Sequence, residues 1–135
     1  MEVGTNYEFS YTVKNTDLAK EISEEPKDEF PAVLATSRMV ALMELAAARI
    51  MQPLLSEGDL SVGVGVNITH MAATANNETV KIVAEFKGML GKLYKFDVSL
   101  FDSAGLAGQG RHTRAIVERE DIVQSAQKRA SKQSS

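Results

Sequence analysis

The sequence predicts an α+β fold in which a curved antiparallel sheet of about five strands wraps one long helix. Two observations carry this prediction. Residues 31–53 form one stretch that is apolar on nearly every helical face, which is typical of a helix inside a fold. Residues 61–117 then alternate apolar and polar side chains in four segments separated by turn signals. Tight turns make neighbouring strands antiparallel, so the simplest packing is one sheet around the helix.

Length and composition indicate a single domain of ordinary size. The charged fraction is 24% and the net charge is −3, which argues against a nucleic-acid binder because such proteins need a basic face. The absence of cysteine excludes disulfides and thiolate chemistry. No signal peptide and no apolar run of membrane-spanning length is recognisable, so we expect a cytoplasmic protein without a membrane partner. The domain is expected at residues 1–120. Residues 121–135 should form a short helix around 121–129 and a disordered tail from residue 130.

The first strand and the segment after it have contrasting patterns. Tyr7, Phe9, Tyr11 and Val13 alternate with polar residues, as in a half-buried strand. Residues 15–30 are polar and acidic and predict a loop, either a solvated connector or a flap beside a pocket with Phe30 as its apolar plug.

The central helix contains one carboxylate without an obvious partner. Thr36 or Ser37 is a suitable N-cap, and Pro53 marks the end. The residues three, four and seven positions from Glu44 are all apolar. A buried, unpaired carboxylate is costly, so Glu44 must reach water or receive a partner from another element.

The strand segments place one histidine toward the helix. Val62, Val64, Val66 and Ile68 share one face of a regular strand, and His70 continues their parity. Glycines at positions 63 and 65 signal a bulge, which leaves that parity unsettled. The later strands are expected over the ranges 80–86, 94–100 and 106–117, with turns at 88–92 and 102–105.

Glu44, His70 and the hydroxyl at the helix start form a possible catalytic set. Carboxylate and imidazole are the usual groups of acid–base catalysis, and a helix N-terminus offers N–H donors to an oxyanion. Together they suggest hydrolysis or acyl transfer. The structural alternatives are that Thr36 only caps the helix, that Glu44 forms an interface ion pair, and that His70 is a core histidine. His112 is expected on a strand surface, and no motif indicates a metal or cofactor.

The helix also indicates self-association. An apolar rod needs more cover than one sheet face supplies, so we expect a homodimer. The alternative is a monomer in which residues 15–30 cover the exposed side.

Several local motifs together resemble the fluoroacetyl-CoA thioesterase family, which has the hot-dog fold. They span residues 30–118 and comprise Ala-Thr36, Glu44, Gln-Pro53, Val-Gly63, His70-x-Ala-Ala-Thr and Gly-Arg-His-Thr-Arg114. The resemblance implies that Thr36, Glu44 and His70 are catalytic.

The same resemblance implies further features of the site. Gly63 and Arg114 would contact an acyl-CoA substrate, and active sites would lie near a dimer interface. The fluoroacetyl specialist has a phenylalanine-rich gate, whereas this chain has Phe30 alone in that segment, which favours a general short-acyl thioesterase.

The expected function is therefore hydrolysis of a small acyl-CoA thioester by Thr36, Glu44 and His70. The attacking group is either the hydroxyl of Thr36 (with Ser37 beside it) or the Glu44 carboxylate. The alternatives are a non-catalytic acyl-CoA or small-ligand binding protein and a hot-dog dehydratase or hydratase.

Overall fold

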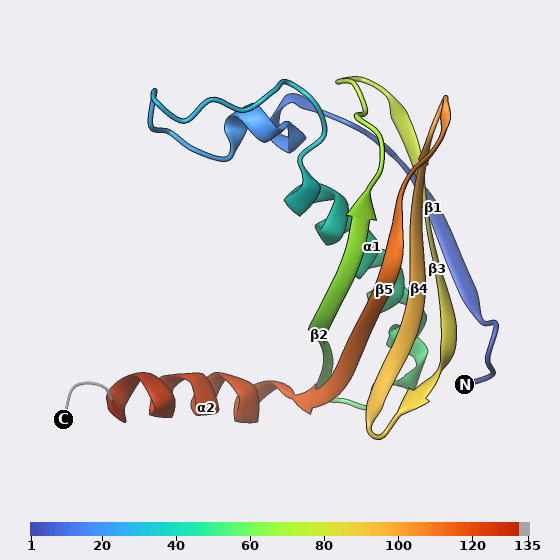
Figure 1. The fold of residues 1–135 in the computed structure, drawn as a ribbon. Coiled ribbons are helices and arrows are strands. Elements are labelled where there is room, and N and C mark those ends of the chain that lie inside the picture. The colour runs from blue at the N-terminus through green and yellow to red at the C-terminus, as the bar shows by residue number, and fades with distance from the viewer. Residues whose placement is uncertain (133–135) are drawn as a thin grey trace.

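The computed structural model describes residues 1–132 and confirms the predicted layers (Figure 1). Five strands form one antiparallel sheet in the order β1-β3-β4-β5-β2, and the sheet curves around helix α1. The strands are β1 (Asn6–Thr12), β2 (Asp59–His70), β3 (Thr79–Leu90), β4 (Leu93–Asp102) and β5 (Gly105–Glu118), and the helices are α1 (Thr36–Met51) and α2 (Arg119–Ser131).

The connection between β2 and β3 differs from the prediction. Tight turns join β3 to β4 and β4 to β5, but β2 and β3 are not neighbours, so the expectation of four strands joined by tight turns is wrong at this point. Residues 71–78 instead cross from one edge of the sheet toward the other. On the way Leu34 N–H donates to the carbonyl of Thr74, and Val33 forms a bridge with Ala75. The crossing segment therefore ties the end of β2 to the residues that precede α1.

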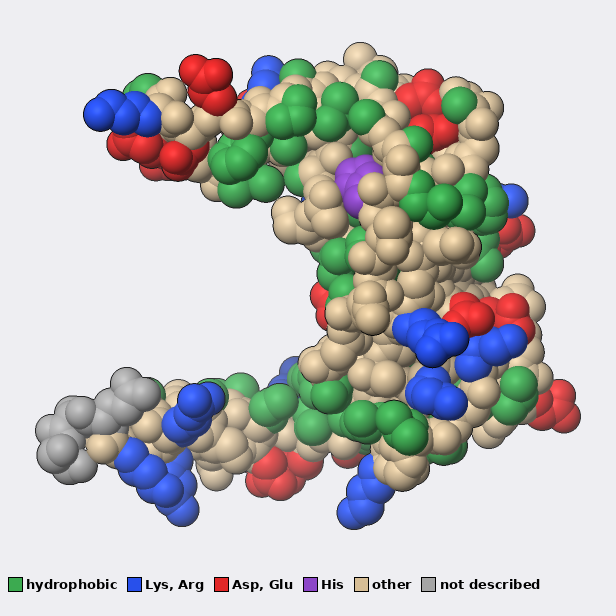
Figure 2. Space-filling view, viewed as in Figure 1, with side chains coloured by type: hydrophobic (Ala, Val, Ile, Leu, Met, Phe, Trp, Pro, Cys, Tyr) green, Lys and Arg blue, Asp and Glu red, His purple; other side chains and the backbone are tan. Residues whose placement is uncertain are grey.

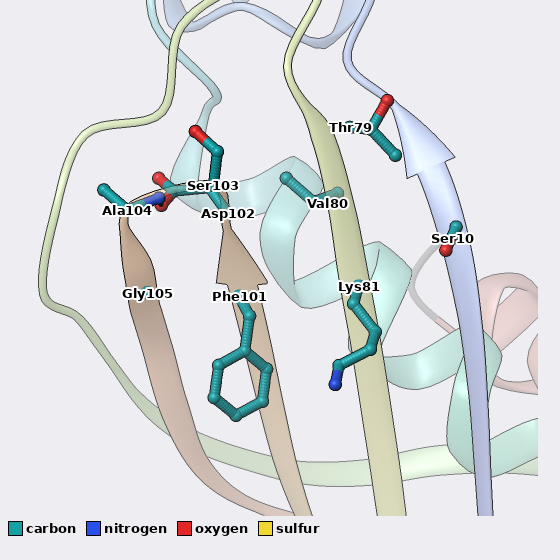
Figure 3. Close-up of a pocket in the computed structure, with 9 residues that line it drawn as sticks. All are labelled: Ser10, Thr79, Val80, Lys81, Phe101, Asp102, Ser103, Ala104 and Gly105. Atoms are coloured by element: carbon teal, nitrogen blue, oxygen red, sulfur yellow. Dashed lines mark hydrogen bonds between the residues drawn. The ribbon is translucent and has the colours of Figure 1, made fainter.

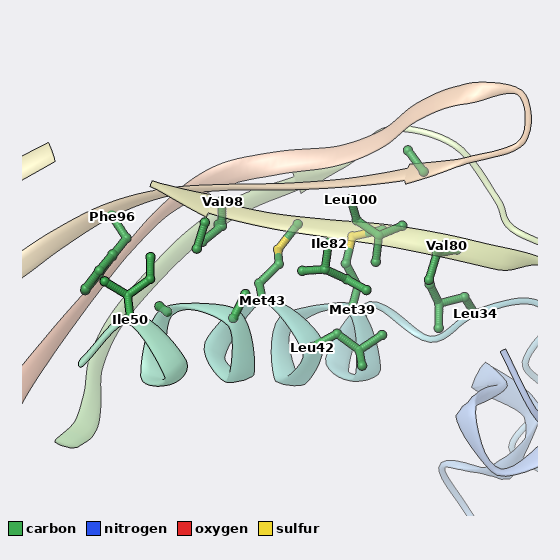
Figure 4. Packing of buried hydrophobic residues seen from close by; sticks show 14 of the residues in the cluster. Leu34, Met39, Leu42, Met43, Ile50, Val80, Ile82, Phe96, Val98 and Leu100 are labelled. Carbon is green, nitrogen blue, oxygen red and sulfur yellow. The ribbon is translucent and has the colours of Figure 1, made fainter. Parts of the chain in front are cut away.

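The core lies between α1 and the concave face of the sheet (Figure 4). Long side chains of α1 pack on the apolar side chains of β3 and β4. From the helix these are Met39, Leu42, Met43 and Ile50, and from the strands Val80, Ile82, Phe96, Val98 and Leu100. Burial of each such side chain contributes about 1.5–3 kcal/mol. This contact fixes which side of α1 faces the sheet.

The start of α1 is anchored from outside the helix. The N-cap is Ala35, which makes no side-chain cap bond, so the prediction of Thr36 or Ser37 as the N-cap is wrong. Ala35 N–H donates to the carbonyl of Asp17, whose buried carboxylate accepts from Tyr11 and Arg38. Burial would raise the pKa of Asp17, but these bonds and one from Lys14 N–H lower it below its ordinary value.

The C-terminal helix α2 extends away from the rest of the molecule (Figure 1). It follows β5 directly and has no buried residue. The predicted helix is therefore present but longer than expected, since Ala130 and Ser131 are helical rather than disordered. The remainder of the predicted tail, residues 133–135, lies outside the described residues. No helix within residues 1–132 is both long and apolar enough to cross a membrane.

Candidate active site

Thr36 and His70 form a hydrogen-bonded pair at the N-terminal end of α1. The Thr36 hydroxyl lies 2.7 Å from His70 Nδ1. Thr36 is the first residue of α1 and His70 the last of β2. The crossing segment 71–78 holds these two ends together. His70 Nε2 is buried and has no hydrogen-bond partner among residues 1–132.

A bulge in β2 puts Gly63 and His70 on the same face of the sheet. The two residues are seven positions apart, so a regular strand would point them to opposite faces. The register against β5 shifts between Gly63 and Gly65, which leaves Val64 as the extra residue. His70 thus faces α1, as predicted, and Gly63 does so as well, contrary to the face assigned by simple alternation.

Glu44 lies in the middle of α1, opposite β5 and the bulge. Its carboxylate is 3.8 Å from Arg114 Nη1 and 4.0 Å from His112 Nε2. The side chain is 40% exposed and borders an open depression of about 410 Å³ between α1 and β2. A Cβ at Gly63 would collide with Glu44 Oε1, so glycine is what leaves room for the carboxylate. Glu44 therefore reaches water and also has partners from another element.

His112 is buried in this cluster, so its predicted place on the strand surface is wrong. Its Nδ1 is 2.8 Å from the carbonyl of Gly65, and its Nε2 is 3.1 Å from Arg114 Nη1. Burial lowers the pKa of His112, and the Arg114 charge lowers it further while Glu44 raises it. Burial also lowers the pKa of Arg114, and Glu44 opposes that shift. Arg114 additionally donates to the side chain and the carbonyl of Ser61.

The predicted site residues thus form two clusters instead of one. Eight helical positions separate Thr36 from Glu44, about 12 Å along the axis. Within residues 1–132, no hydrogen bond or ion pair joins His70 to Glu44, which departs from the expectation that His70 would reach the carboxylate. Phe30 is 46% exposed and makes no core contact. Gly63 and Arg114 belong to the Glu44 cluster.

A depression at the far side of the sheet offers less chemistry. The depression in Figure 3 also measures about 410 Å³, and it lies at the β4–β5 turn on the outer face of the sheet. Lys81 lies over the Phe101 ring there, 5.2 Å from its centroid, and no histidine lines this surface. Within residues 1–132, no three histidine or acidic side chains are placed to hold a metal ion. The two clusters on α1 remain the best candidates for catalysis.

The sheet order and the central helix define the hot-dog fold. Residues 13–120 match the model of the fluoroacetyl-CoA-specific thioesterase family. The fluoroacetyl-CoA thioesterase of Streptantibioticus cattleyicolor is 35% identical over 122 residues, which cover 89% of this chain and 88% of the relative.

Solved structures agree with this relationship. A structure of the fluoroacetyl-CoA thioesterase has a TM-score of 0.90 at 34% identity, with 95% of this chain and 96% of that chain covered. A variant of that enzyme in complex with fluoroacetate and CoA has a TM-score of 0.85 at 35% identity, with coverages of 90% and 99%. The chain belongs to the fluoroacetyl-CoA-specific thioesterase family. It is a thioester hydrolase.

Proposed function

We propose that this protein hydrolyses the thioester of a small acyl-CoA and that the acyl group is transferred first to Thr36. The 2.7 Å contact between the Thr36 hydroxyl and His70 Nδ1 carries this proposal, because a hydroxyl bonded to an imidazole is an activated nucleophile. The related enzyme solved with fluoroacetate and CoA supports a CoA ester as the substrate.

The proposed reaction has two steps. His70 takes the Thr36 proton as the oxygen attacks the thioester carbonyl, and the imidazolium then protonates the departing CoA sulfur. Water, deprotonated by His70, next attacks the acyl-threonine ester and releases the carboxylic acid and the free hydroxyl. The N–H groups of the first turn of α1 have no intrahelical acceptor and would stabilise the oxyanion in both steps.

Glu44 requires a second protomer to take part. In one chain it lies too far along α1 to contact the same substrate carbonyl as Thr36. We place Glu44 of one protomer beside the Thr36–His70 pair of its partner, where the carboxylate would face the same substrate carbonyl as the Thr36 hydroxyl. The edge position of β2 supports this arrangement, because antiparallel pairing of two such edges would direct the His70 end of one strand toward the Gly63 end of the other.

The surface beside β2 suits such a dimer. Figure 2 shows the molecule hollowed on one side, between the segment that precedes α1 and the helix α2, with apolar side chains on both borders. An unpaired edge strand is itself a template for pairing. Exposed apolar side chains are found on the 15–35 segment (Ile22, Phe30), on α1 (Leu45), on β2 and just after it (Val64, Val66, Met71), and on α2 (Ile122, Val123).

Activity and the proposed acyl-enzyme can be tested together. Purified protein is assayed with acetyl-, propionyl-, butyryl- and fluoroacetyl-CoA and a thiol reagent, and quenched samples are analysed by intact mass spectrometry. We expect turnover of short acyl chains and an acyl adduct on Thr36. Saturable binding without turnover would instead support the non-catalytic binding protein. Labelling of the Glu44 carboxylate by ¹⁸O-water would move the nucleophile to Glu44, and hydration of an enoyl-CoA would support a hydratase.

Mixed dimers test whether each site uses two protomers. The Thr36→Ala and Glu44→Gln proteins, each expected to be inactive by itself, are purified separately. They are then unfolded together and refolded as a mixture. If each site takes Thr36 and Glu44 from different chains, a mixed dimer has one intact and one doubly defective site, and the mixture recovers about a quarter of wild-type activity. If both residues act within one chain, no mixing ratio restores activity. Self-mixed variants are the control.

A further inference from the structure

We propose that His112 is a positioning residue, which as the neutral Nδ1–H imidazole holds the Arg114 guanidinium against Glu44. The inference rests on the proposed function for its catalytic consequence, while the contacts that carry it are independent of any substrate. His112 makes no contact with the Thr36–His70 pair, and its Nε2 lies 4.0 Å from the Glu44 carboxylate, close to the 3.8 Å of Arg114 Nη1.

The hydrogen bonds of His112 determine its tautomer. The Gly65 carbonyl can only accept, so the proton must be on Nδ1, 2.8 Å away. Arg114 Nη1 can only donate, so Nε2 at 3.1 Å must be the acceptor. Both contacts are satisfied by one neutral ring and by no other protonation state. An imidazolium would leave Nε2–H pointing at a guanidinium.

The bulge in β2 lies beside the Gly65 carbonyl, which accepts from the His112 ring. The register shift at Val64 accompanies the bond from the His112 ring to the Gly65 carbonyl. The other side of the ring packs near Phe96, with centroids 6.5 Å apart. His112 is only 2% exposed, so the imidazole has a single orientation in which Nε2 faces Arg114.

Arg114 is held by His112 and Ser61 together. Its Nε donates to Ser61 Oγ at 3.0 Å and its Nη2 to the Ser61 carbonyl at 2.9 Å. Nη1 is shared between His112 and the Glu44 carboxylate, which is 3.8 Å away. Without the His112 acceptor, Nη1 lacks a partner on the sheet side, and the guanidinium is free to turn about its bonds to Ser61. Glu44 would then lose a fixed counter-charge.

Two amide variants separate positioning from simple packing. In His112→Asn the short amide reaches the Gly65 carbonyl but not Arg114, whereas in His112→Gln the longer amide oxygen reaches Arg114. NMR spectra of ¹⁵N-labelled protein report the tautomer of His112 and the solvent exchange of the Arg114 Nη1 protons, which face His112. Thermal denaturation of both variants controls for folding, and kcat and KM are measured with the best acyl-CoA.

The expected result is a neutral Nδ1–H ring in the wild-type protein and slowly exchanging Arg114 Nη1 protons that become fast only in His112→Asn. That variant should lose about 10- to 100-fold in kcat with little change in KM, the effect of one lost bond to a charged group. His112→Gln should recover most of that loss at similar stability. An Nε2–H ring, or unchanged Arg114 exchange in His112→Asn, would overturn the inference. So would equal kcat losses in both variants.

If the wild-type protein hydrolyses no thioester, the proposed function fails. The ring tautomer and the Arg114 exchange rates still decide the role of His112, because neither needs turnover.

Discussion

The two clusters on α1 are built in contrasting ways. Thr36 and His70 are joined by one hydrogen bond and are brought together by the crossing segment and the residues before the helix. Glu44, Arg114 and His112 form a charged group in which two members come from adjacent positions on one face of β5. Side chains positioned by connecting segments adjust to a substitution more easily than side chains positioned by paired strands. We therefore expect conservative substitutions to be tolerated better at the hydroxyl end than at the carboxylate end.

The largest effect is expected at the charged cluster. Glu44→Gln keeps the shape of the side chain but removes the charge that faces Arg114, and kcat/KM should fall about 10³-fold. Steady-state assays with a short acyl-CoA measure the loss. Glu85→Gln, an exposed carboxylate on β3 paired with Lys87, is the matched control and should keep full activity. A loss below tenfold at Glu44 would remove it from the catalytic set.

The second-largest effect is expected from filling the space beside the Glu44 carboxylate. The added methyl group in Gly63→Ala would displace Glu44, and His112 Cε1 lies only 3.3 Å from the same point. We expect kcat/KM to fall about 100-fold through misplacement of the carboxylate alone. Gly105→Ala, at a positive φ but far from both clusters, controls for general glycine effects on stability. Wild-type kinetics in Gly63→Ala would contradict the close approach of Glu44 to β2.

Substitution of Asp17, which anchors the start of α1 beside Thr36, tests the hydroxyl end. Asp17→Asn removes the charge that accepts from Arg38 and Tyr11 and should reduce the free energy of unfolding by about 2 kcal/mol near neutral pH. The folded-state pKa of Asp17 is below its unfolded value, so its contribution is present above the unfolded value and is lost as the pH falls through the folded one.

Urea denaturation at a series of pH values measures this contribution. The wild-type and Asp17→Asn curves should converge in acid, and Asp28→Asn, on an exposed loop, should follow the wild type throughout. Parallel curves down to strongly acidic pH would show that Asp17 is not the titrating group.

The smallest effects are expected for conservative changes at the hydroxyl end. Thr36→Ser keeps the oxygen bonded to His70 and should retain activity to within about tenfold, whereas Thr36→Ala loses the nucleophile. Ser37→Ala should behave as wild type, because the imidazole contacts Thr36 and not its neighbour. Steady-state kinetics of the three variants decide between the two hydroxyls. Inactivation by Ser37→Ala would exchange their roles.

The layers of the fold were accessible from the sequence, since a single apolar helix and the alternating strands leave few ways to bury both. The strand that pairs with β2 could not be predicted, because the strand order depends on the crossing segment 71–78. The hydrogen bonds of that segment, such as Leu34 N–H to the Thr74 carbonyl, join residues far apart in the sequence. The residue pattern itself suggested Glu44, His70 and the hydroxyl at the start of α1, and resemblance to a family added Gly63 and Arg114. Their division into two clusters followed from neither, because it depends on where each residue sits along α1.

The position of His112 was missed although a signal existed. Alternate residues of a strand share a face, so His112 must face the same way as Arg114, which the resemblance already implied would contact the substrate. The charged residues on either side of His112 suggested a surface strand and concealed that parity. Asp17 had no such signal, because the donors to its carboxylate come from β1, α1 and the backbone of Lys14.

The extra residue in β2 constrains how related sequences can vary in length. Gly63 and His70 share a face only because an odd separation is corrected by Val64. Deleting or inserting a single residue between them would turn one away from α1, so this interval can change only by pairs or by relocation of the irregularity. A one-residue gap in this interval of an alignment would therefore identify chains in which the positions of Gly63 and His70 no longer face the same side of the sheet.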